Sequence, residues 1–193
     1  MKLYMIRHGQ CGVNVSVSFG GGFDSPLTEK GRRDALMTRR LLEGIHFDAV
    51  YSSPLSRALD TARIALPGVE PEIRQELEEL RNGSLAGYSV EECFAKYGES
   101  LRRDRQDRDF TAYGGESISM HDKRVAGFLK EMEAMPENST AAAFCHEGTI
   151  HCALRCVLGF PLNVWQLHAA NGSVSVFDYS GGLWHLEKWS MTE

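Results

Sequence analysis

The residues best suited to chemistry stand directly after a short apolar stretch near the start of the chain. Arg7 and His8 follow the apolar and aromatic residues 3–6, and Asn14 comes a few positions later. An arginine presents a planar fork of N–H donors that fits two phosphate oxygens, and a neutral imidazole is a nucleophile toward phosphorus. The asparagine adds an uncharged amide donor. This combination predicts a site that binds phosphate and transfers it.

Two further stretches of the chain end in the same kind of side chain. Residues 47–52 and 140–145 read as buried strands, and Arg57 and His146 follow them. Ser53 is expected to be the N-cap of the helix that carries Arg57, with Pro54 in its first turn. A helix N-terminus favours anions, and ligands of open α/β sheets bind at the carboxyl ends of the strands. We therefore expect Arg7, His8, Arg57 and His146 to meet in one crevice.

The remaining pattern is that of an α/β fold. Thr28 caps a predicted helix that ends near Gly44, Ile73 falls in a short edge strand, and Ser89 opens a capping box with Glu92. An amphipathic segment follows residues 114–117 and ends near residue 136, and two alternating stretches, 173–178 and 183–189, predict a closing hairpin. We expect a three-layer sandwich with a mostly parallel central sheet and helices on both faces. It forms one domain over residues 1–193, with loop and helical cap elements around 15–23 and 88–113.

Bulk composition limits the possible partners. The chain has 193 residues, is 42% hydrophobic and carries a formal net charge of -5. A general nucleic-acid binder is usually basic, so a small-molecule partner is expected and nucleic acid is not. No apolar run approaches 18 residues and the N-terminus lacks a secretory pattern, so we expect no membrane association and a cytoplasmic location. The sequence does not determine the oligomeric state.

The five cysteines predict neither disulfides nor a metal site. They are odd in number and scattered, which is typical of reduced thiols. The group of Cys145, His146, His151, Cys152 and Cys156 lacks a Cys-x-x-Cys pair, so no metal and no cofactor are expected. A cysteine phosphatase would need an arginine six positions after its nucleophile, but His151 follows Cys145 at that spacing.

Less specific explanations remain for single residues. Alone, Arg7 could pair with a carboxylate, His8 could be a hydrogen-bonded histidine near the surface, and Arg57 could be an exposed helix residue. The charge-dense segment 101–109 fits a solvated helix face with ion pairs, although a role in substrate binding stays open. The joint pattern at several strand ends favours the functional interpretation.

The order of these motifs resembles the histidine phosphatase superfamily, in its phosphoglycerate mutase-like group. The matches run in family order from residue 3 to about residue 159. They comprise Arg7-His8-Gly9 with Asn14, the turn 24–31, the helix motif 53–62, the acidic loop 77–87, the Gly-Gly-Glu-Ser segment 114–117, and His146. By this resemblance, the fold is the phosphoglycerate mutase-like α/β sandwich.

The resemblance also implies roles for these residues. His8 would take the phosphoryl group as a phosphohistidine, and Arg7, Asn14, Arg57 and His146 would bind its oxygens. Glu79 would be the general acid that protonates the leaving group and then the base that activates water, with Glu78 as its adjacent competitor. The candidate substrate-binding set is completed by neighbours of these residues, namely Gln10, Cys11, Glu147 and Gly148.

Two positions depart from the family pattern. Cys11 stands where Thr or Ser is common, which removes a hydroxyl donor near the phosphate. Glu147 stands where a small residue is common. A carboxylate there would repel a phosphate unless it is turned away or paired, and we expect Glu147 to point away from the site.

The predicted activity is hydrolysis of a small phosphomonoester. Residues 87–114 are shorter than the corresponding segment of the mutases, which favours a phosphatase over a cofactor-dependent phosphoglycerate mutase. Arg102 and Arg103 resemble the paired arginines with which mutases hold a carboxylate, so the mutase is the alternative. A non-catalytic phosphate-binding regulator is the third possibility, because of Cys11 and Glu147.

Overall fold

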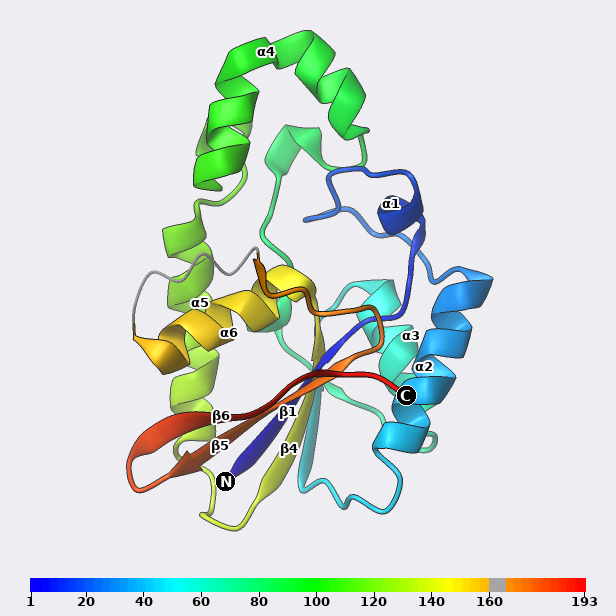
Figure 1. The fold of residues 1–193 in the computed structure, drawn as a ribbon, viewed down its shortest axis with the longest axis vertical. Helices are drawn as coiled ribbons and strands as arrows, with labels where there is room; N and C mark the ends of the chain where they lie inside the picture. The colour runs from blue at the N-terminus through cyan, green and yellow to red at the C-terminus, as the bar shows by residue number, and fades with distance from the viewer. Residues whose placement is uncertain (160–165) are drawn as a thin grey trace.

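A six-stranded sheet forms the centre of the computed structural model, which describes residues 1–159 and 166–193 (Figure 1). The strand order is β3-β2-β4-β1-β5-β6. The strands are β1 (Lys2–Arg7), β2 (Ala49–Ser52), β3 (Glu72–Ile73), β4 (Thr140–Cys145), β5 (Val174–Ser180) and β6 (Leu183–Met191). The first four are mutually parallel, and the closing hairpin β5-β6 extends the sheet in antiparallel fashion. The α/β prediction is confirmed, with a mixed sheet whose parallel part holds the predicted strand ends.

Strand register explains why the predicted residues converge. Arg7 pairs with Cys145 across β1 and β4, and Ser52 pairs with Phe144 across β2 and β4. The three parallel strands therefore end at the same level. The residues that follow them emerge at one edge of the sheet.

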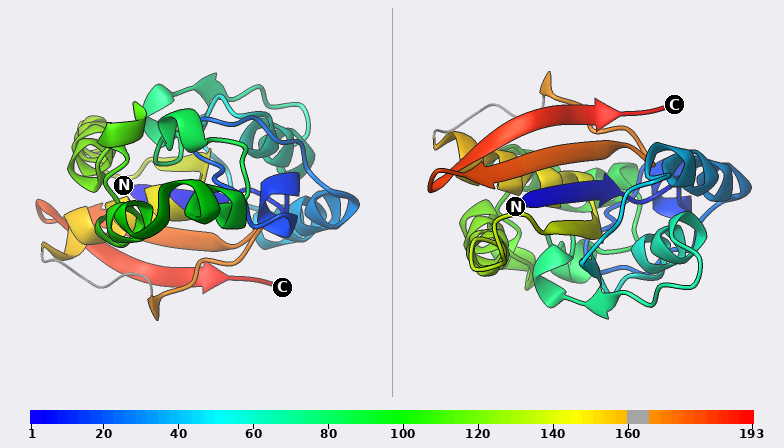
Figure 2. Two further views of the ribbon diagram at one scale, coloured as in Figure 1. Left: turned by 90° about the horizontal axis from the view of Figure 1, so that it is seen from above. Right: turned by 90° about the horizontal axis from the view of Figure 1, so that it is seen from below.

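Helices cover both faces of the sheet (Figures 1 and 2). Side chains alternate along β1, so Leu3 and Met5 pack on one side and Ile6 on the other. The first side is covered by α5 (Ile118–Met132) and α6 (Glu147–Leu158), and the second by α2 (Glu29–Leu41) and α3 (Ser56–Ala65). Two apolar clusters thus hold the sheet between helical layers, as predicted. None of the helices within the described residues has the length and apolarity to cross a membrane.

A third group of elements lies beyond the carboxyl ends of the parallel strands. It contains α1 (Gly12–Val15), α4 (Val90–Asp107) and the 3₁₀ turns η1 (Gln75–Leu77), η2 (Gly83–Leu85) and η3 (Thr111–Tyr113). The predicted capping box opens α4, where Ser89 Oγ accepts from the N–H of Glu92 at 3.2 Å. The helix bends at Gly98, whose φ of +58° interrupts the regular backbone. Phe19, Leu85, Leu101 and Phe110 form a separate apolar cluster that joins segment 15–23 to this group.

The start of α3 differs from the prediction. The helix begins at Ser56 with Leu55 as N-cap, so Ser53 and Pro54 lie outside it. Asp24 Oδ1 instead accepts from the N–H and the hydroxyl of Ser56, both at 2.8 Å. The Ser53 hydroxyl accepts from the Leu55 N–H at 3.4 Å and lies 2.8 Å from His146 Nε2, so it supports the turn before the helix and not the N-cap.

Candidate active site

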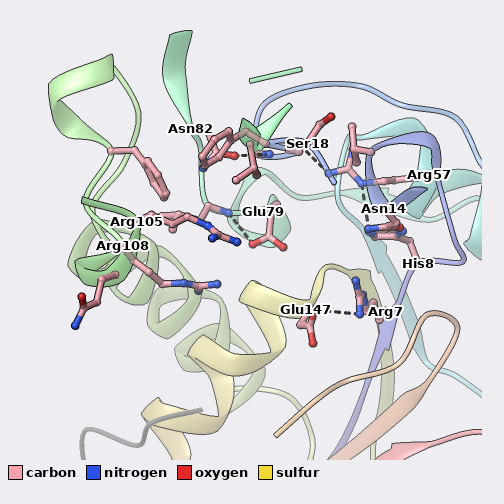
Figure 3. A pocket seen from close by; sticks show the side chains of 18 of the residues that line it. Arg7, His8, Asn14, Ser18, Arg57, Glu79, Asn82, Arg105, Arg108 and Glu147 are labelled. Atoms are coloured by element: carbon pink, nitrogen blue, oxygen red, sulfur yellow. Dashed lines mark hydrogen bonds and ion pairs between the residues drawn. The ribbon is translucent and has the colours of Figure 1, made fainter. Parts of the chain in front are cut away.

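A cavity of about 760 Å³ opens at the carboxyl ends of β1, β2 and β4 (Figure 3). Its base is lined by Arg7, His8 and Arg57, and Glu79 and Glu147 line its sides. The opposite wall is contributed by α4 and its C-terminal end, with Phe94, Arg102, Arg105, Gln106, Arg108 and Phe110. Residues of segment 15–23 and of 88–113 therefore line the same cavity as the strand-end residues.

His8 is held as a neutral imidazole with its Nε2 unprotonated. The ring is almost fully buried, and its Nδ1 lies 2.7 Å from the carbonyl oxygen of Gly9, which assigns a proton to Nδ1. The Nε–H of Arg57 donates to His8 Nε2 at 3.2 Å. Burial and the charges of Arg57 and Arg7 keep the pKa of His8 well below 6.5, against a smaller opposing effect of the Gly9 hydrogen bond. A lone pair is thus available on Nε2 at neutral pH.

The glycine after His8 permits this arrangement. A Cβ on Gly9 would collide with the carbonyl group of Gly31, so a larger residue would push the chain away from α2. The Gly9 N–H donates to Thr61 Oγ1 of α3 at 3.0 Å. The backbone after β1 is thereby fixed between α2 and α3.

Arg57 connects α3 to the loop over the site. It is 1% exposed, and its terminal nitrogens donate to the carbonyl oxygens of Phe23 at 2.8 Å and Gly20 at 3.1 Å. The same guanidinium contacts His8 through Nε. One side chain therefore fixes both the imidazole and segment 15–23, which is more than the exposed-helix interpretation allows.

His146 lies beside His8 at the start of α6. The two ring centroids are 5.1 Å apart, and His146 is completely buried. Its Nε2 lies 2.8 Å from Ser53 Oγ, and its Nδ1 has no hydrogen-bond partner among the described residues. Burial, then the charges of Arg57 and any charge on His8, keep the pKa of His146 well below 6.5. Both imidazoles are neutral in the free protein.

Glu79 points into the cavity from the segment between η1 and η2. One carboxylate oxygen accepts from the N–H of Leu80 at 2.8 Å, and the other accepts from the N–H of Gly148 at 3.2 Å. Burial raises the pKa of Glu79, but His121, Arg108 and these two N–H groups together lower it below 4.5. The side chain is therefore a carboxylate at neutral pH. The predicted residue Gly148 serves as a backbone donor to Glu79, and a Cβ there would collide with the carboxylate.

A buried ion pair fixes the backbone that carries Glu79. Arg124 of α5 donates to the carbonyl oxygens of Glu76 and Glu78, both at 2.8 Å, and of Glu79 at 3.0 Å. Its other contacts are to the Glu116 carboxylate, at 2.9 and 3.0 Å. The glutamate of the Gly-Gly-Glu-Ser segment therefore has a structural role: Glu116 holds Arg124, which positions the loop that carries Glu79.

Glu147 corrects the prediction that it points away from the site. Its carboxylate lines the cavity and lies 3.0 Å from Arg7 NH1, while Arg7 also donates to the carbonyl oxygen of Ala169 at 2.6 Å. Of the two ways to avoid repulsion, the structure uses pairing with Arg7 and not an orientation away from the site. Arg7 is thus paired with a carboxylate while still lining the cavity.

Of the predicted residues that follow His8, Asn14 lines the cavity, whereas Gln10 and Cys11 lie behind it. Asn14 lines the cavity and accepts hydrogen bonds from the Cys11 N–H and thiol, both at 3.1 Å. Cys11 is fully buried and lies outside the lining, with its thiol directed at Asn14. Gln10 is also outside the lining, because its side-chain oxygen accepts from the Thr28 hydroxyl at 2.9 Å. Gln10 and Cys11 are therefore placed as supports for the loop, not as lining residues.

Several lining residues were absent from the predicted set. Arg105 and Arg108 lie in the segment interpreted as a solvated helix face, and Arg108 has a left-handed backbone with φ of +52° that turns its side chain into the cavity (Figure 3). Asn82 lines the cavity and accepts from the Gly21 N–H at 2.8 Å. Asn171, which does not line the cavity, supports His8 from behind by donating to its carbonyl oxygen at 3.1 Å. The repeated arginine spacing in 102–108 was the only signal that could have found the first two.

No cluster suited to a metal ion occurs within residues 1–159 and 166–193. The cysteines considered for zinc lie on two different elements, and Cys145 and Cys152 are buried in the same apolar cluster. Cys145 lies in the sheet and Cys152 within α6, where burial raises the pKa of both thiols, while Cys156 is exposed.

Comparison with known proteins agrees with this geometry. The chain is 31% identical to phosphoserine phosphatase 1 of Hydrogenobacter thermophilus, over 91% of this chain and 85% of the relative. It is 28% identical to the adenosylcobalamin/alpha-ribazole phosphatase of Salmonella typhimurium, over 94% and 92%. The solved structure of Bacillus stearothermophilus YhfR superposes with a TM-score of 0.89 at 26% identity, covering 100% of this chain and 98% of that chain. Because the family model for branch 1 matches residues 3–192, the chain belongs to the histidine phosphatase superfamily.

Proposed function

We propose that this protein hydrolyses a small phosphomonoester through a phosphohistidine on His8. The observation that carries the proposal is the unprotonated Nε2 of His8, which lies at the base of an arginine-rich cavity within 3.2 Å of Arg57 Nε. Imidazole is nucleophilic only when neutral, and the depressed pKa of His8 keeps it so. Small phosphorylated molecules are the substrates named for the phosphoserine and alpha-ribazole relatives.

In the first step, His8 Nε2 attacks phosphorus and the bond to the substrate oxygen breaks. The phosphoryl group is bound by Arg7, Arg57, Asn14 and His146, which spread its charge over the equatorial oxygens. The proton on Nδ1 stays hydrogen-bonded to the Gly9 carbonyl oxygen, so the new phosphoimidazolium is stabilised from behind. Glu79 donates a proton to the departing alkoxide, which leaves as an alcohol.

In the second step, water attacks the phosphohistidine. Glu79, now a carboxylate, accepts a proton from the water as its oxygen bonds to phosphorus. The bond between phosphorus and Nε2 breaks, and neutral His8 is restored with inorganic phosphate as the product. Glu79 then returns this proton to the departing phosphate or to solvent, so the free site again carries an ionised Glu79.

The lowered pKa of Glu79 defines where its proton comes from. Free Glu79 is ionised, but a phosphate monoester has a second pKa near 6 and can enter as the monoanion with a proton. A bound phosphate also offsets the charge of Arg108, one of the groups that keep the pKa of Glu79 low. Transfer of the substrate proton to Glu79 then supplies the general acid.

A mutase-type phosphoryl transfer is the second candidate. It is favoured by Arg102, Arg105 and Arg108, which line the wall opposite His8 and could bind an acidic group on the acceptor. In that reaction an alcohol of a second substrate replaces water as the acceptor. The phosphohistidine step is common to both candidates.

A phosphomonoester panel with matched variants tests the proposal. Wild-type protein should release inorganic phosphate from at least one ester, and His8→Ala should reduce the rate at least about a thousandfold, because the nucleophile is lost. His46→Ala is the control, since this histidine is highly exposed. Radiolabelled phosphate should attach to wild type and not to His8→Ala. Interconversion of phosphoglycerates without phosphate release would favour the mutase, and phosphate binding without turnover would leave a regulator.

A further inference from the structure

Glu147 places a negative charge where a phosphate dianion must bind. Its Oε2 lies 3.0 Å from Arg7 NH1, and both residues line the cavity (Figure 3). Arg7 is 9% exposed at its side chain and Glu147 is 26% exposed, so the pair is partly shielded from water. A carboxylate at this distance interacts with Arg7 and with any anion that Arg7 holds.

The carboxylate is fixed in this position by contacts on its other side. Oε1 lies 2.8 Å from His168 Nδ1 and accepts from the Ala169 N–H at 3.2 Å. Glu147 is also the first residue of α6, where a helix N-terminus stabilises an anionic side chain. Arg7, His168 and the Ala169 N–H thus hold the carboxylate beside the cavity. If Arg7 turns to a phosphate, the contacts with residues 168 and 169 remain.

We propose that Glu147 sets the affinity of the site for phosphate by competing with it for Arg7. An incoming dianion gains the attraction of Arg7 but must also bear the repulsion of the neighbouring carboxylate. The net effect is weaker binding of the product and its faster release. This inference rests on the proposed phosphatase function, in which inorganic phosphate leaves the site after every turnover.

A purely structural role for Glu147 makes the opposite prediction. Its Oε1 contacts hold residues 168–169, and nearby Asn171 donates to the carbonyl oxygen of His8. If Glu147 acted only through this segment, its loss would disorder the site and weaken phosphate binding. The sign of the change in phosphate affinity therefore separates the two roles.

The experiment measures inorganic phosphate binding by calorimetry on folded protein. Glu147→Gln and Glu147→Ala remove the charge, and Glu147→Asp retains it. Glu70→Gln is the control, because it makes the same change in net charge at an exposed residue paired with Arg63 and outside the cavity. Inhibition of ester hydrolysis by phosphate gives a second readout of the same affinity.

We expect the phosphate dissociation constant to fall about tenfold in Glu147→Gln and Glu147→Ala, a change that corresponds to about 1.4 kcal/mol. Glu147→Asp and Glu70→Gln should stay within about threefold of wild type. Unchanged or weaker phosphate binding in both Glu147→Gln and Glu147→Ala would overturn the competition. That result in a wild type that hydrolyses phosphomonoesters rejects this inference alone, whereas a wild type that neither hydrolyses esters nor binds phosphate rejects the proposed function as well.

Discussion

Replacing Arg124 with methionine should damage stability and catalysis together. The guanidinium makes three hydrogen bonds to the carbonyl oxygens of Glu76, Glu78 and Glu79 and an ion pair with Glu116. Methionine preserves much of the side-chain volume but none of these contacts. The backbone that carries Glu79 then loses its anchor.

The loss of stability in Arg124→Met comes from the Glu116 carboxylate, which loses its main partner. Glu116 is only 7% exposed at its side chain, and removal of one partner of a buried pair costs about 3–5 kcal/mol. The lower end applies, because Arg81 still contacts Glu116 through its N–H at 3.2 Å and its guanidinium at 3.2 Å. A loss of about 3 kcal/mol corresponds to a fall in Tm of roughly 6–12 °C for a chain of this size. A shift of the Glu79 carboxylate by about 1 Å would lower kcat about a hundredfold.

Thermal unfolding and steady-state kinetics on one preparation measure both effects. Lys130→Met is the matched control, since this lysine lies on the same helix with its side chain 80% exposed. The double variant Arg124→Met with Glu116→Leu should be less destabilised than Arg124→Met alone, because it leaves no unpaired buried carboxylate. An Arg124→Met protein with a Tm within 2 °C of wild type and unchanged kcat would refute the reasoning.

Three further outcomes follow from the ionisation states and burial of the site. Because burial and nearby arginines hold the pKa of His8 well below 6.5, kcat should not fall between pH 7.5 and 5.5, a range in which the proton-carrying monoanion of the substrate becomes more abundant. A loss centred near pH 6.5 in the pH–rate profile would contradict a neutral His8. Since the pKa of Glu79 is below 4.5, its carboxylate is lost only as the pH falls through that lower value, so this range leaves the free base intact. Of the five thiols, only Cys156 is exposed, and a disulfide reagent should therefore modify one equivalent in native protein and five after unfolding. Cys11→Ser should keep kcat within about threefold of wild type. Cys11 lies outside the cavity lining, and a serine hydroxyl can donate to Asn14 as the thiol does.

The convergence of Arg7, His8 and His146 was predictable because it depends on local signals. Apolar runs marked the strands, and parallel strands place the residues that follow them at one edge of a sheet. The register of β1 and β4, with Arg7 opposite Cys145, realises this expectation. Local signals did not place Glu79. Only the spacing of the family motif indicated that its loop reaches the same cavity.

The opposite wall of the cavity could not be predicted from residue types. Whether Arg105 and Arg108 face solvent or the cavity depends on the bend of α4 at Gly98 and on the left-handed backbone of Arg108. The backbone of Arg108 is held where the chain leaves α4, since the Ile118 N–H donates to the Arg108 carbonyl oxygen at 2.8 Å. The helical pattern of 101–109 is compatible with either orientation.

The side-chain partners of Glu147 and Ser53 also could not be predicted from residue type alone. An N-cap preference at Ser53 is real, but its hydroxyl is shared between the Leu55 N–H and His146, and the helix begins only at Ser56. A carboxylate at position 147 is unfavourable beside a phosphate, yet it is favourable beside Arg7 in the free site. Sequence reasoning weighs one partner at a time, whereas the fold presents all partners together.

The charges that bind phosphate in the proposed reaction also control the two imidazoles. Arg57 and Arg7 help to keep the pKa of both His8 and His146 depressed while the site is free. A bound phosphate offsets these positive charges, so the pKa of His146 must rise when substrate enters. His146 can then be protonated and donate a hydrogen bond to the phosphoryl group. His8, whose Nε2 forms the bond to phosphorus, has to react in its neutral form, and the hydrogen bond from Nδ1 to Gly9 leaves Nε2 unprotonated, with its lone pair facing the Nε–H of Arg57. In the proposed reaction, the two adjacent histidines would therefore have different roles, because only His8 has its Nδ1 proton committed to a backbone carbonyl.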